Sequence, residues 1–310
     1  MTSSIDRRWW FNAGISWSTG GVADGTRHVL AYVNDTHAVA YRLERKLAGG
    51  IRSGAYEVRD AMGGRAVLKW STDLTWARQV LRAAPVVERM RRAGWPTPRW
   101  LAFGVTPEGH PYQLQEHVLG QPLQRLDGPA VRVLLDLVDS HHGLDPDPGR
   151  NWSTFVSDVV FDDRDGARED ARQVDVDAAR LVERFMTLCV RYRRQRLNST
   201  DLVHGDLHPG NVLVTDGRVA GVIDVEAIGS GTRAIDLARL LATAYAQDAR
   251  PRTVATLGRA AAAPAGPGGL VLCAAASFFT MTVFLTRHNS PALPQYYAAI
   301  ERLLHDLNRI

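Results

Sequence analysis

The chain has 310 residues, enough for two lobes or one large domain, and its 45% hydrophobic and 23% charged residues are those of an ordinary soluble protein. Its net charge of +4 comes with arginines spread along several segments, without an aromatic platform or a nucleic-acid motif, so we expect no nucleic-acid partner. The N-terminus has no apolar run long enough for a signal peptide, and Cys189 and Cys273 indicate neither a metal nor a redox pair, so we expect a cytoplasmic protein.

The N-terminal part of the chain combines strand-like runs with one helical region. The first 30 residues have no clear periodicity, and we expect an irregular extension at 1–30 whose role stays open. Pro85 should end or kink the helical region at Ala84. We expect an α+β lobe of antiparallel strands and one helical region. The strand-like runs lie at 29–33, 38–47, 55–59, 65–70, 100–105 and 111–118, and the helical region at 76–92.

A glycine-rich turn precedes an unusual lysine. Glycine lets the backbone come close to phosphates and present N–H groups to them, so Gly49, Gly50, Ser53 and Gly54 are candidate phosphate contacts. Only two of the 37 basic residues are lysines, which leaves 37 − 2 = 35 arginines. Lys69 ends a short apolar strand, and because Lys and Arg differ in shape, its presence there indicates a site built for an ammonium group.

From Gly128 onward the sequence is mainly helical. The run Leu270–Thr286 is nearly uncharged but falls short of the ~20 residues of a membrane span, so we expect a buried core helix and no membrane partner. Residues 261–269, rich in Ala, Pro and Gly, are expected to form a loop. Helices are predicted at 129–142, 152–161, 178–196, 234–246, 269–287 and 296–308.

The stretch 202–236 carries the most informative pattern. Asp206 lies five residues before Asn211, and two apolar runs follow with Asp216-Gly217 between them. Asp-Gly between such runs is a strong hairpin signal, and the second run ends on Asp224. Loop and hairpin thus deliver a carboxylate, a carboxamide and a second carboxylate to one place. Phosphoryl transfer uses this set: one Asp orients the attacking hydroxyl and accepts its proton, while Asn and Asp hold Mg²⁺.

The spacing is that of the kinase catalytic loop, although His204-Gly205-Asp206 stands in place of H-R-D and Ile223-Asp224-Val225-Glu226 in place of D-F-G. It resembles the aminoglycoside phosphotransferase and choline kinase-like family, small-molecule kinases built on the protein-kinase fold. The resemblance implies a bilobal α+β chain. Residues 1–117 would form a nucleotide-binding lobe with an antiparallel sheet plus a helix, and residues 118–310 a mainly helical catalytic and acceptor-binding lobe.

The resemblance also implies roles for the four motif residues. Asp206 would be the catalytic residue that orients the acceptor hydroxyl, and Asn211 and Asp224 would coordinate Mg²⁺. Lys69 would reach the α- and β-phosphates of ATP or GTP. A catalytically silent relative would typically lack one of these four, and all four are present.

Further residues have supporting roles by the same resemblance. The extended segment 112–120 resembles the hinge between the lobes, where the Glu116 carbonyl and the Val118 amide would pair with adenine. His204 would brace the catalytic loop, and Asp236 would serve as a helix N-cap or loop brace.

The family also uses a helix glutamate that pairs with the strand lysine. Glu88 is the only acid between residues 76 and 92, but it lies beyond Pro85. Glu57 or Glu44 could substitute for it.

The acceptor is constrained by charge. The segment 162–177 holds seven acids and three arginines, −7 + 3 = −4, so the rest of the chain carries +8. Such a run is commonly a solvated face. In the resembled family, however, helices in this position line the acceptor pocket, so Asp162, Asp163, Asp165 and also Glu226 are candidate acceptor contacts. We expect a weakly charged hydroxyl compound rather than a polycationic aminoglycoside.

We interpret the chain as a kinase that transfers the γ-phosphoryl group of ATP or GTP to a hydroxyl of a small molecule, and favour an antibiotic as the acceptor. The scarcity of lysine suggests a GC-rich bacterial source, where antibiotics are often made. The alternatives are a metabolic kinase of a sugar, amino alcohol or nucleoside, and a silent kinase-like binding protein. The oligomeric state is not predicted by the sequence.

Overall fold

A computed structural model of the chain describes residues 21–47 and 54–309. The chain forms two compact units. The described part of the N-terminal unit runs to Leu119 and takes in residues 220–226 as well, whereas the C-terminal unit holds 120–219 and 227–309. The predicted lobes, 1–117 and 118–310, did not include this return of residues 220–226 to the N-terminal unit.

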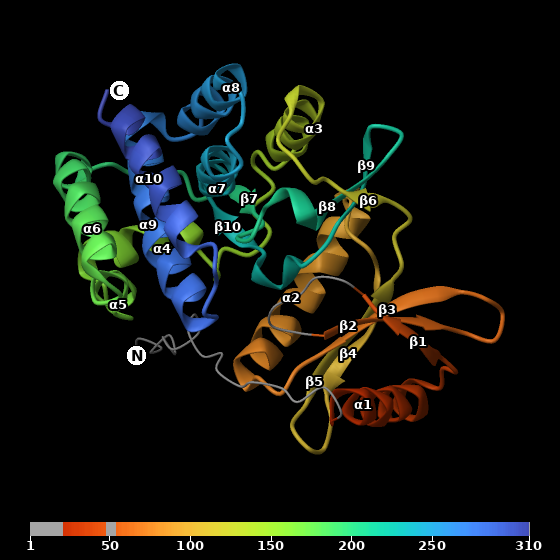
Figure 1. The fold of residues 1–310 in the computed structure, drawn as a ribbon. Helices are drawn as coiled ribbons and strands as arrows, with labels where there is room; N and C mark the ends of the chain where they lie inside the picture. Colours follow the sequence, from red (N-terminus) through yellow and green to blue (C-terminus); the bar gives the residue numbers. More distant parts are fainter. Residues whose placement is uncertain (1–20, 48–53, 310) are drawn as a thin grey trace. The chain divides into compact units, whose positions relative to one another are not determined.

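The N-terminal unit is built on a five-stranded antiparallel sheet (Figure 1). Because side chains alternate across a strand, Tyr56, Leu68 and Leu114 lie in the core cluster on one face. Lys69 and Gln113, paired across β3 and β5, lie on the other face. In sheet order the strands are β1 (Arg42–Lys46), β2 (Gly54–Arg59), β3 (Arg65–Trp70), β5 (Pro111–Glu116) and β4 (Trp100–Val105).

Helix α1 (Gly21–His37) occupies a stretch for which we predicted an irregular extension and a strand at 29–33. Val29 and Val33, one helical turn apart, are fully buried against the sheet, and the Trp70 indole N–H donates to the Thr26 hydroxyl at 3.0 Å. Packing on the sheet therefore overrides the strand preference of the β-branched residues. The remainder of the predicted extension, residues 1–20, lies outside the described residues.

Helix α2 (Leu74–Arg92) continues through Pro85, so of the two predicted effects of this proline, a helix end or a kink at Ala84, the helix end is wrong. Its N-terminus is capped by Asp73, whose carboxylate accepts the Thr75 N–H at 2.8 Å. Pro85 is exposed, while Val80 and Val87 are buried on the inner side. Burial of that side outweighs the ~3 kcal/mol that an interior proline costs.

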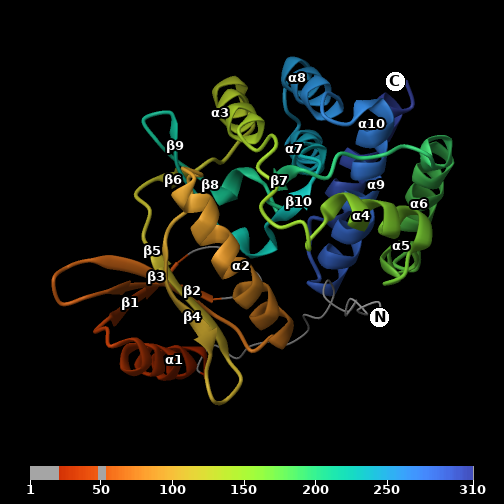
Figure 2. The ribbon, with the colours of Figure 1, turned by 180° about the vertical axis from the view of Figure 1, so that it is seen from behind.

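The C-terminal unit is mainly helical and is organised around α9 (Gly266–Arg287), which contacts α5, α6, α7 and α10 (Figure 2). By length and composition α9 could cross a membrane, but 72% of its most apolar window is buried inside the unit. Phe278 of α9 stacks on Phe185 of α6, with ring centroids 5.3 Å apart. The prediction of a buried core helix is confirmed.

The other helices follow the predicted periodicity with shifted ends. Two helices, α5 and α8, were not predicted, and the predicted loop at 261–269 shrinks because α9 begins at Gly266. The α-helices besides α9 are α3 (Gly128–Asp139), α4 (Trp152–Ser157), α5 (Ala167–Arg172), α6 (Val176–Cys189), α7 (Ala234–Ala246), α8 (Pro251–Ala262) and α10 (Leu293–Leu307).

Short strands frame the motif region. β7 (Asp201–Val203) pairs with β10 (Gly229–Gly231), and β6 (Gln121–Pro122) pairs with β8 (Val212–Thr215). β8 is followed by β9 (Arg218–Val222) after a turn in which Asp216 and Gly217 have φ angles of 50° and 72°. Two consecutive left-handed residues define a type I′ turn, so the predicted Asp-Gly hairpin is confirmed.

Candidate active site

The N-terminal unit brings Lys69 and Asp224 together. The Lys69 side chain lies on the sheet face away from α1, and its ammonium forms an ion pair with the Asp224 carboxylate. Its Nζ lies 3.1 Å from a Glu226 carboxylate oxygen. Lys69 is only 5% exposed. A buried lysine is held in place by such pairing, because an unpaired buried charge is strongly unfavourable.

The charges of this cluster depend on one another. Burial lowers the pKa of Lys69, but the neighbouring carboxylates of Asp224 and Glu226 outweigh burial and raise it above its ordinary value. Burial raises the pKa of Glu226, and the Lys69 ammonium opposes that shift. Asp224 has a φ of 60°, a left-handed backbone conformation that non-glycine residues seldom adopt and that is common at functional sites.

Glu226 is held by more than the lysine. The orientation of the Gln113 amide that satisfies its donors and acceptors donates to the Glu226 carboxylate at 2.7 Å and accepts the Trp100 indole N–H at 2.8 Å. The Arg82 guanidinium of α2 donates to the Glu226 backbone carbonyl at 2.8 Å. Glu226 is 7% exposed. The structure thus places this predicted acceptor contact inside the unit, beside Lys69.

Glu88, the predicted helix partner of Lys69, pairs with other residues. The Glu88 carboxylate pairs with Arg91 at 2.9 Å and Arg92 at 2.7 Å on its own helix, and these partners lower the pKa of Glu88 to about 2. The pairing of Glu88 with Lys69 is therefore wrong. Glu57 pairs with Arg45 at 2.8 Å, and Glu44 lies 3.7 Å from Arg59, so neither alternative carboxylate is found at the lysine.

The predicted hinge follows β5. The Glu116 N–H donates to the Arg99 carbonyl at 2.9 Å, while the Val118 amide has no hydrogen-bond partner among the described residues. A Cβ on Gly221 of β9 would lie 2.9 Å from a Val118 methyl carbon, so glycine there lets Val118 approach the strand closely. The adenine contacts of Glu116 and Val118 stay predictions.

The glycine-rich turn is only partly described. Gly54 begins β2 and pairs with Trp70 of β3, and a Cβ there would lie 2.4 Å from the Tyr56 ring. Gly49, Gly50 and Ser53 lie outside the described residues. Their phosphate contacts stay predictions.

In the C-terminal unit, Asp236 fixes the catalytic loop. Its two carboxylate oxygens accept the backbone N–H groups of His204 at 2.8 Å and Gly205 at 3.0 Å. The His204 ring nitrogen Nδ1 accepts the Asp206 N–H at 3.2 Å. Asp236 is 1% exposed, and burial raises its pKa while His204 and the two N–H donors oppose that shift. Of the two predicted roles for Asp236, the structure shows the loop brace.

Gly205 has a structural reason to replace the arginine of protein kinases. Its φ is 82°, and a Cβ there would lie 2.1 Å from the Trp152 ring. The Trp152 indole N–H donates to the Ala227 carbonyl at 3.0 Å, which fixes the ring against the loop. A side chain at position 205 would be strained and would displace Trp152.

Asp206 and Asn211 are joined within the loop. The Asn211 side-chain N–H donates to the Asp206 carbonyl at 3.0 Å, so its amide oxygen is the end that remains to bind a cation. Asp206 has a partner that the sequence analysis missed: Arg239 of α7 lies 2.5 Å from its carboxylate. The sequence signal was available, because Arg239 is the only basic residue of α7.

Asn211 and Asp224 each carry a ligand type that suits a hard divalent cation. Mg²⁺ prefers oxygen ligands, and Asn211 offers an amide oxygen while Asp224 offers a carboxylate. Among the described residues there is no cluster of three or more His, Cys, Asp or Glu side chains that could hold a metal by themselves. Asn211 belongs to the C-terminal unit and Asp224 to the N-terminal unit.

Arginines within the segment 162–177 neutralise part of its negative charge. Asp162 pairs with Arg164 at 2.9 Å, and Asp163 accepts the Arg168 N–H at 2.8 Å at the start of α5. The Asp163 side chain is 7% exposed, and its observed role is to accept a backbone N–H at the start of α5. The acceptor roles of Asp162, Asp163 and Asp165 stay predictions.

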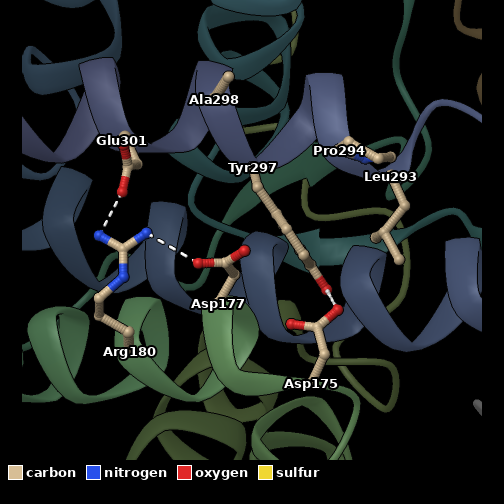
Figure 3. A pocket seen from close by; sticks show the side chains of 8 residues that line it. All are labelled: Asp175, Asp177, Arg180, Leu293, Pro294, Tyr297, Ala298 and Glu301. Carbon is tan, nitrogen blue, oxygen red and sulfur yellow. Dashed lines mark hydrogen bonds and ion pairs between the residues drawn. The ribbon is translucent and has the colours of Figure 1, made fainter.

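A pocket of about 290 Å³ lies between α6 and α10 at the far end of this segment (Figure 3). The Tyr297 hydroxyl donates to Asp175 at 3.2 Å, and Arg180 bridges Asp177 at 3.2 Å and Glu301. None of the predicted site residues lines it. Its charged groups hold the two helices together.

Comparisons with known proteins give a family match and similar folds. The model of the phosphotransferase enzyme family matches residues 44–270, and no curated protein matches significantly. A thermostable mutant of the aminoglycoside phosphotransferase APH(4)-Ia, in a ternary complex with AMP-PNP and hygromycin B, is similar with a TM-score of 0.69 and 16% identity over 89% of this chain and 97% of that one.

Two further structures are similar in fold. The amicoumacin kinase hAmiN, in complex with AMP-PNP, Ca²⁺ and Ami, has a TM-score of 0.61 and 15% identity over 92% of this chain and 99% of that one. The aminoglycoside phosphotransferase APH(3'')-Id from Streptomyces rimosus has a TM-score of 0.57 and 20% identity over 83% and 98%. The predicted protein-kinase-like fold, with an antiparallel sheet in its N-terminal part and a helical C-terminal part, is confirmed.

The buried histidine beside the catalytic-loop brace should set the acid stability of the protein. His141 is fully buried, 3.9 Å from Asp236, and burial lowers its pKa from 6.5 to about 3. Below pH 6.5 the unfolded chain therefore binds a proton that the folded chain refuses, so folding free energy is lost as the pH falls from 6.5 towards 3.

We predict that His141→Leu retains about 3 kcal/mol of the stability that the wild type loses between pH 7 and pH 4. Urea unfolding at a series of pH values measures this, with His305→Gln, at an exposed histidine, as the control. Parallel pH curves for His141→Leu and the wild type would contradict the assignment.

Proposed function

Because the chain belongs to the phosphotransferase enzyme family, we propose that it transfers the γ-phosphoryl group of ATP or GTP to a hydroxyl of a small molecule. The observation that carries this proposal is the buried ion pair of Lys69 with Asp224, since a lysine and a metal-binding aspartate together address the donor phosphates. Such a donor is a cytoplasmic nucleotide, which favours a cytoplasmic location.

The residues would divide the work as follows. Lys69 would neutralise charge on the α- and β-phosphates, and Asn211 and Asp224 would hold Mg²⁺, which would supply further charge neutralisation at the phosphates. Asp206 would orient the acceptor hydroxyl and take up its proton late, because a loose transition state needs little early deprotonation. His204 and Asp236 would keep the Asp206 backbone in place.

An antibiotic is the acceptor class that the comparisons favour. The similar structures include one complex with hygromycin B and one kinase of amicoumacin. Sugar, amino alcohol and nucleoside kinases are the alternative. An acceptor panel distinguishes them: purified protein, Mg²⁺ and ATP or GTP are incubated with aminoglycoside, nucleoside and peptide antibiotics, sugars and amino alcohols. Phosphorylation of a metabolic acceptor alone would replace the antibiotic proposal, and turnover of no compound would favour a silent binding protein.

The contact between Arg239 and Asp206 bears on the acceptor's charge. The arginine lies 2.5 Å from the catalytic carboxylate, and both side chains are partly exposed, at 25% and 44%. A fixed cation at this position repels an acceptor whose reacting hydroxyl is flanked by ammonium groups. It is compatible with a neutral or anionic neighbourhood. We therefore propose a weakly charged hydroxyl compound over a polycationic aminoglycoside.

Asp206→Asn should lower kcat about 10²- to 10⁴-fold, the usual contribution of a general base. Its nucleotide affinity should stay within about twofold of the wild type, because the change acts on the hydroxyl and not on the phosphates. Asp216→Asn in the β8–β9 turn is the matched control, since asparagine tolerates its φ of 50°. A kcat within a few-fold of wild type for Asp206→Asn would rule out the assigned role.

For a weakly charged acceptor, kcat/KM should change less than about threefold between low salt and ~0.5 M salt, because salt screens steering only between charged partners. The double variant Asp162→Asn/Asp165→Asn should leave the acceptor KM nearly unchanged. Asp163 is kept, because it supports the start of α5. A tri- or tetracationic acceptor whose KM rises steeply with salt and with these changes would refute the acceptor proposal and leave the kinase proposal intact.

A further inference from the structure

We propose that Glu226 is the positioning residue for Lys69, in the place where related kinases use a helix glutamate. The inference rests on the proposed function, in which the Lys69 ammonium contacts the donor phosphates. It does not assign Glu226 to the acceptor, the role that the sequence suggested. Instead, the carboxylate two residues after Asp224 turns back to the sheet and holds the lysine at 3.1 Å.

Three residues hold Glu226: Lys69 and Gln113 contact its carboxylate, and Arg82 contacts its backbone carbonyl. The Gln113 amide of β5 donates to it at 2.7 Å, and that amide is itself held by the Trp100 indole N–H at 2.8 Å. Arg82 anchors the Glu226 backbone through its carbonyl at 2.8 Å. Gln113 is fully buried and lies directly opposite Lys69 in the β3–β5 pairing. Lys69, Glu226 and Gln113 thus form one buried polar network.

The two carboxylates at Lys69 have different tasks. An ammonium has three N–H donors, and Lys69 directs donors to two acceptors, Asp224 and Glu226. Asp224 is 39% exposed in its side chain and doubles as a metal ligand in the proposed function, whereas the Glu226 side chain is 10% exposed and faces the lysine. Glu226 therefore holds the ammonium in position independently of what Asp224 binds, which leaves one donor for a phosphate oxygen.

Helix α2 does not offer a competing carboxylate. Its acidic residue, Glu88, is engaged by Arg91 and Arg92. The α2 residue that reaches the cluster is a cation, Arg82, and it contacts the Glu226 backbone. The lysine's partner is consequently tied to the segment that carries the metal-binding aspartate, rather than to a side chain of the helix.

A double-mutant cycle tests the inference with the full-length protein. The dissociation constant of a fluorescent ATP analogue is measured with Mg²⁺ for wild type, Lys69→Met, Glu226→Gln and the double variant. We expect Glu226→Gln to weaken binding about 5- to 20-fold, and the double variant to lie within about threefold of Lys69→Met, because a residue that acts through Lys69 has little left to contribute without it. Glu88→Gln, the control, should stay within about twofold.

Additive effects of the two substitutions, or binding by Glu226→Gln at the wild-type level, would overturn the inference and leave the proposed function standing. A wild type that binds no nucleotide would overturn both. Thermal unfolding checks that the variants fold. If Glu226→Gln does not fold, the cycle is run with Glu226→Asp, which keeps the charge on a shorter side chain. That variant should recover part of the affinity, and in steady state should raise the nucleotide KM more than it lowers kcat.

Discussion

The buried ammonium of Lys69 is the interaction on which the N-terminal half of the site depends. A lysine that is 5% exposed is tolerable only with compensating carboxylates, and both come from the short segment that follows β9. This segment returns to the N-terminal unit from a chain that otherwise forms the C-terminal unit. The ion pair therefore joins Asp224, the proposed metal ligand, to the sheet that would carry the nucleotide.

The C-terminal half depends on a comparable buried carboxylate. Asp236 accepts two consecutive backbone N–H groups, from His204 and Gly205. These bonds fix the backbone directly before Asp206 and so help to position that residue. Gly205 can follow this path because it adopts a φ of 82° beneath the Trp152 ring. In both halves, then, a charge that is costly to bury is used to fix a short loop, and the residues assigned to the chemistry are adjacent to it in the chain.

Local sequence patterns predicted much of this structure, and long-range pairing set the limit. The Asp216-Gly217 hairpin and the strand that carries Lys69 follow from turn chemistry and alternation, which are local properties. The partner of Lys69 lies 157 positions away, so spacing on α2 pointed to Glu88 instead of Glu226. Arg239 was overlooked because its contact with Asp206 arises only when α7 is placed, and the α1 helix was missed because sheet packing overrode β-branched composition.

The central claim, that Asp224 couples Lys69 to a metal-dependent nucleotide site, is tested most directly by titrating Asp224→Ala with a fluorescent ATP analogue in the presence and absence of Mg²⁺. The wild type should bind the analogue more tightly with Mg²⁺. The variant should lose that dependence, because the amide oxygen of Asn211 alone cannot hold a divalent cation against water. An unchanged Mg²⁺ effect in Asp224→Ala would contradict the account.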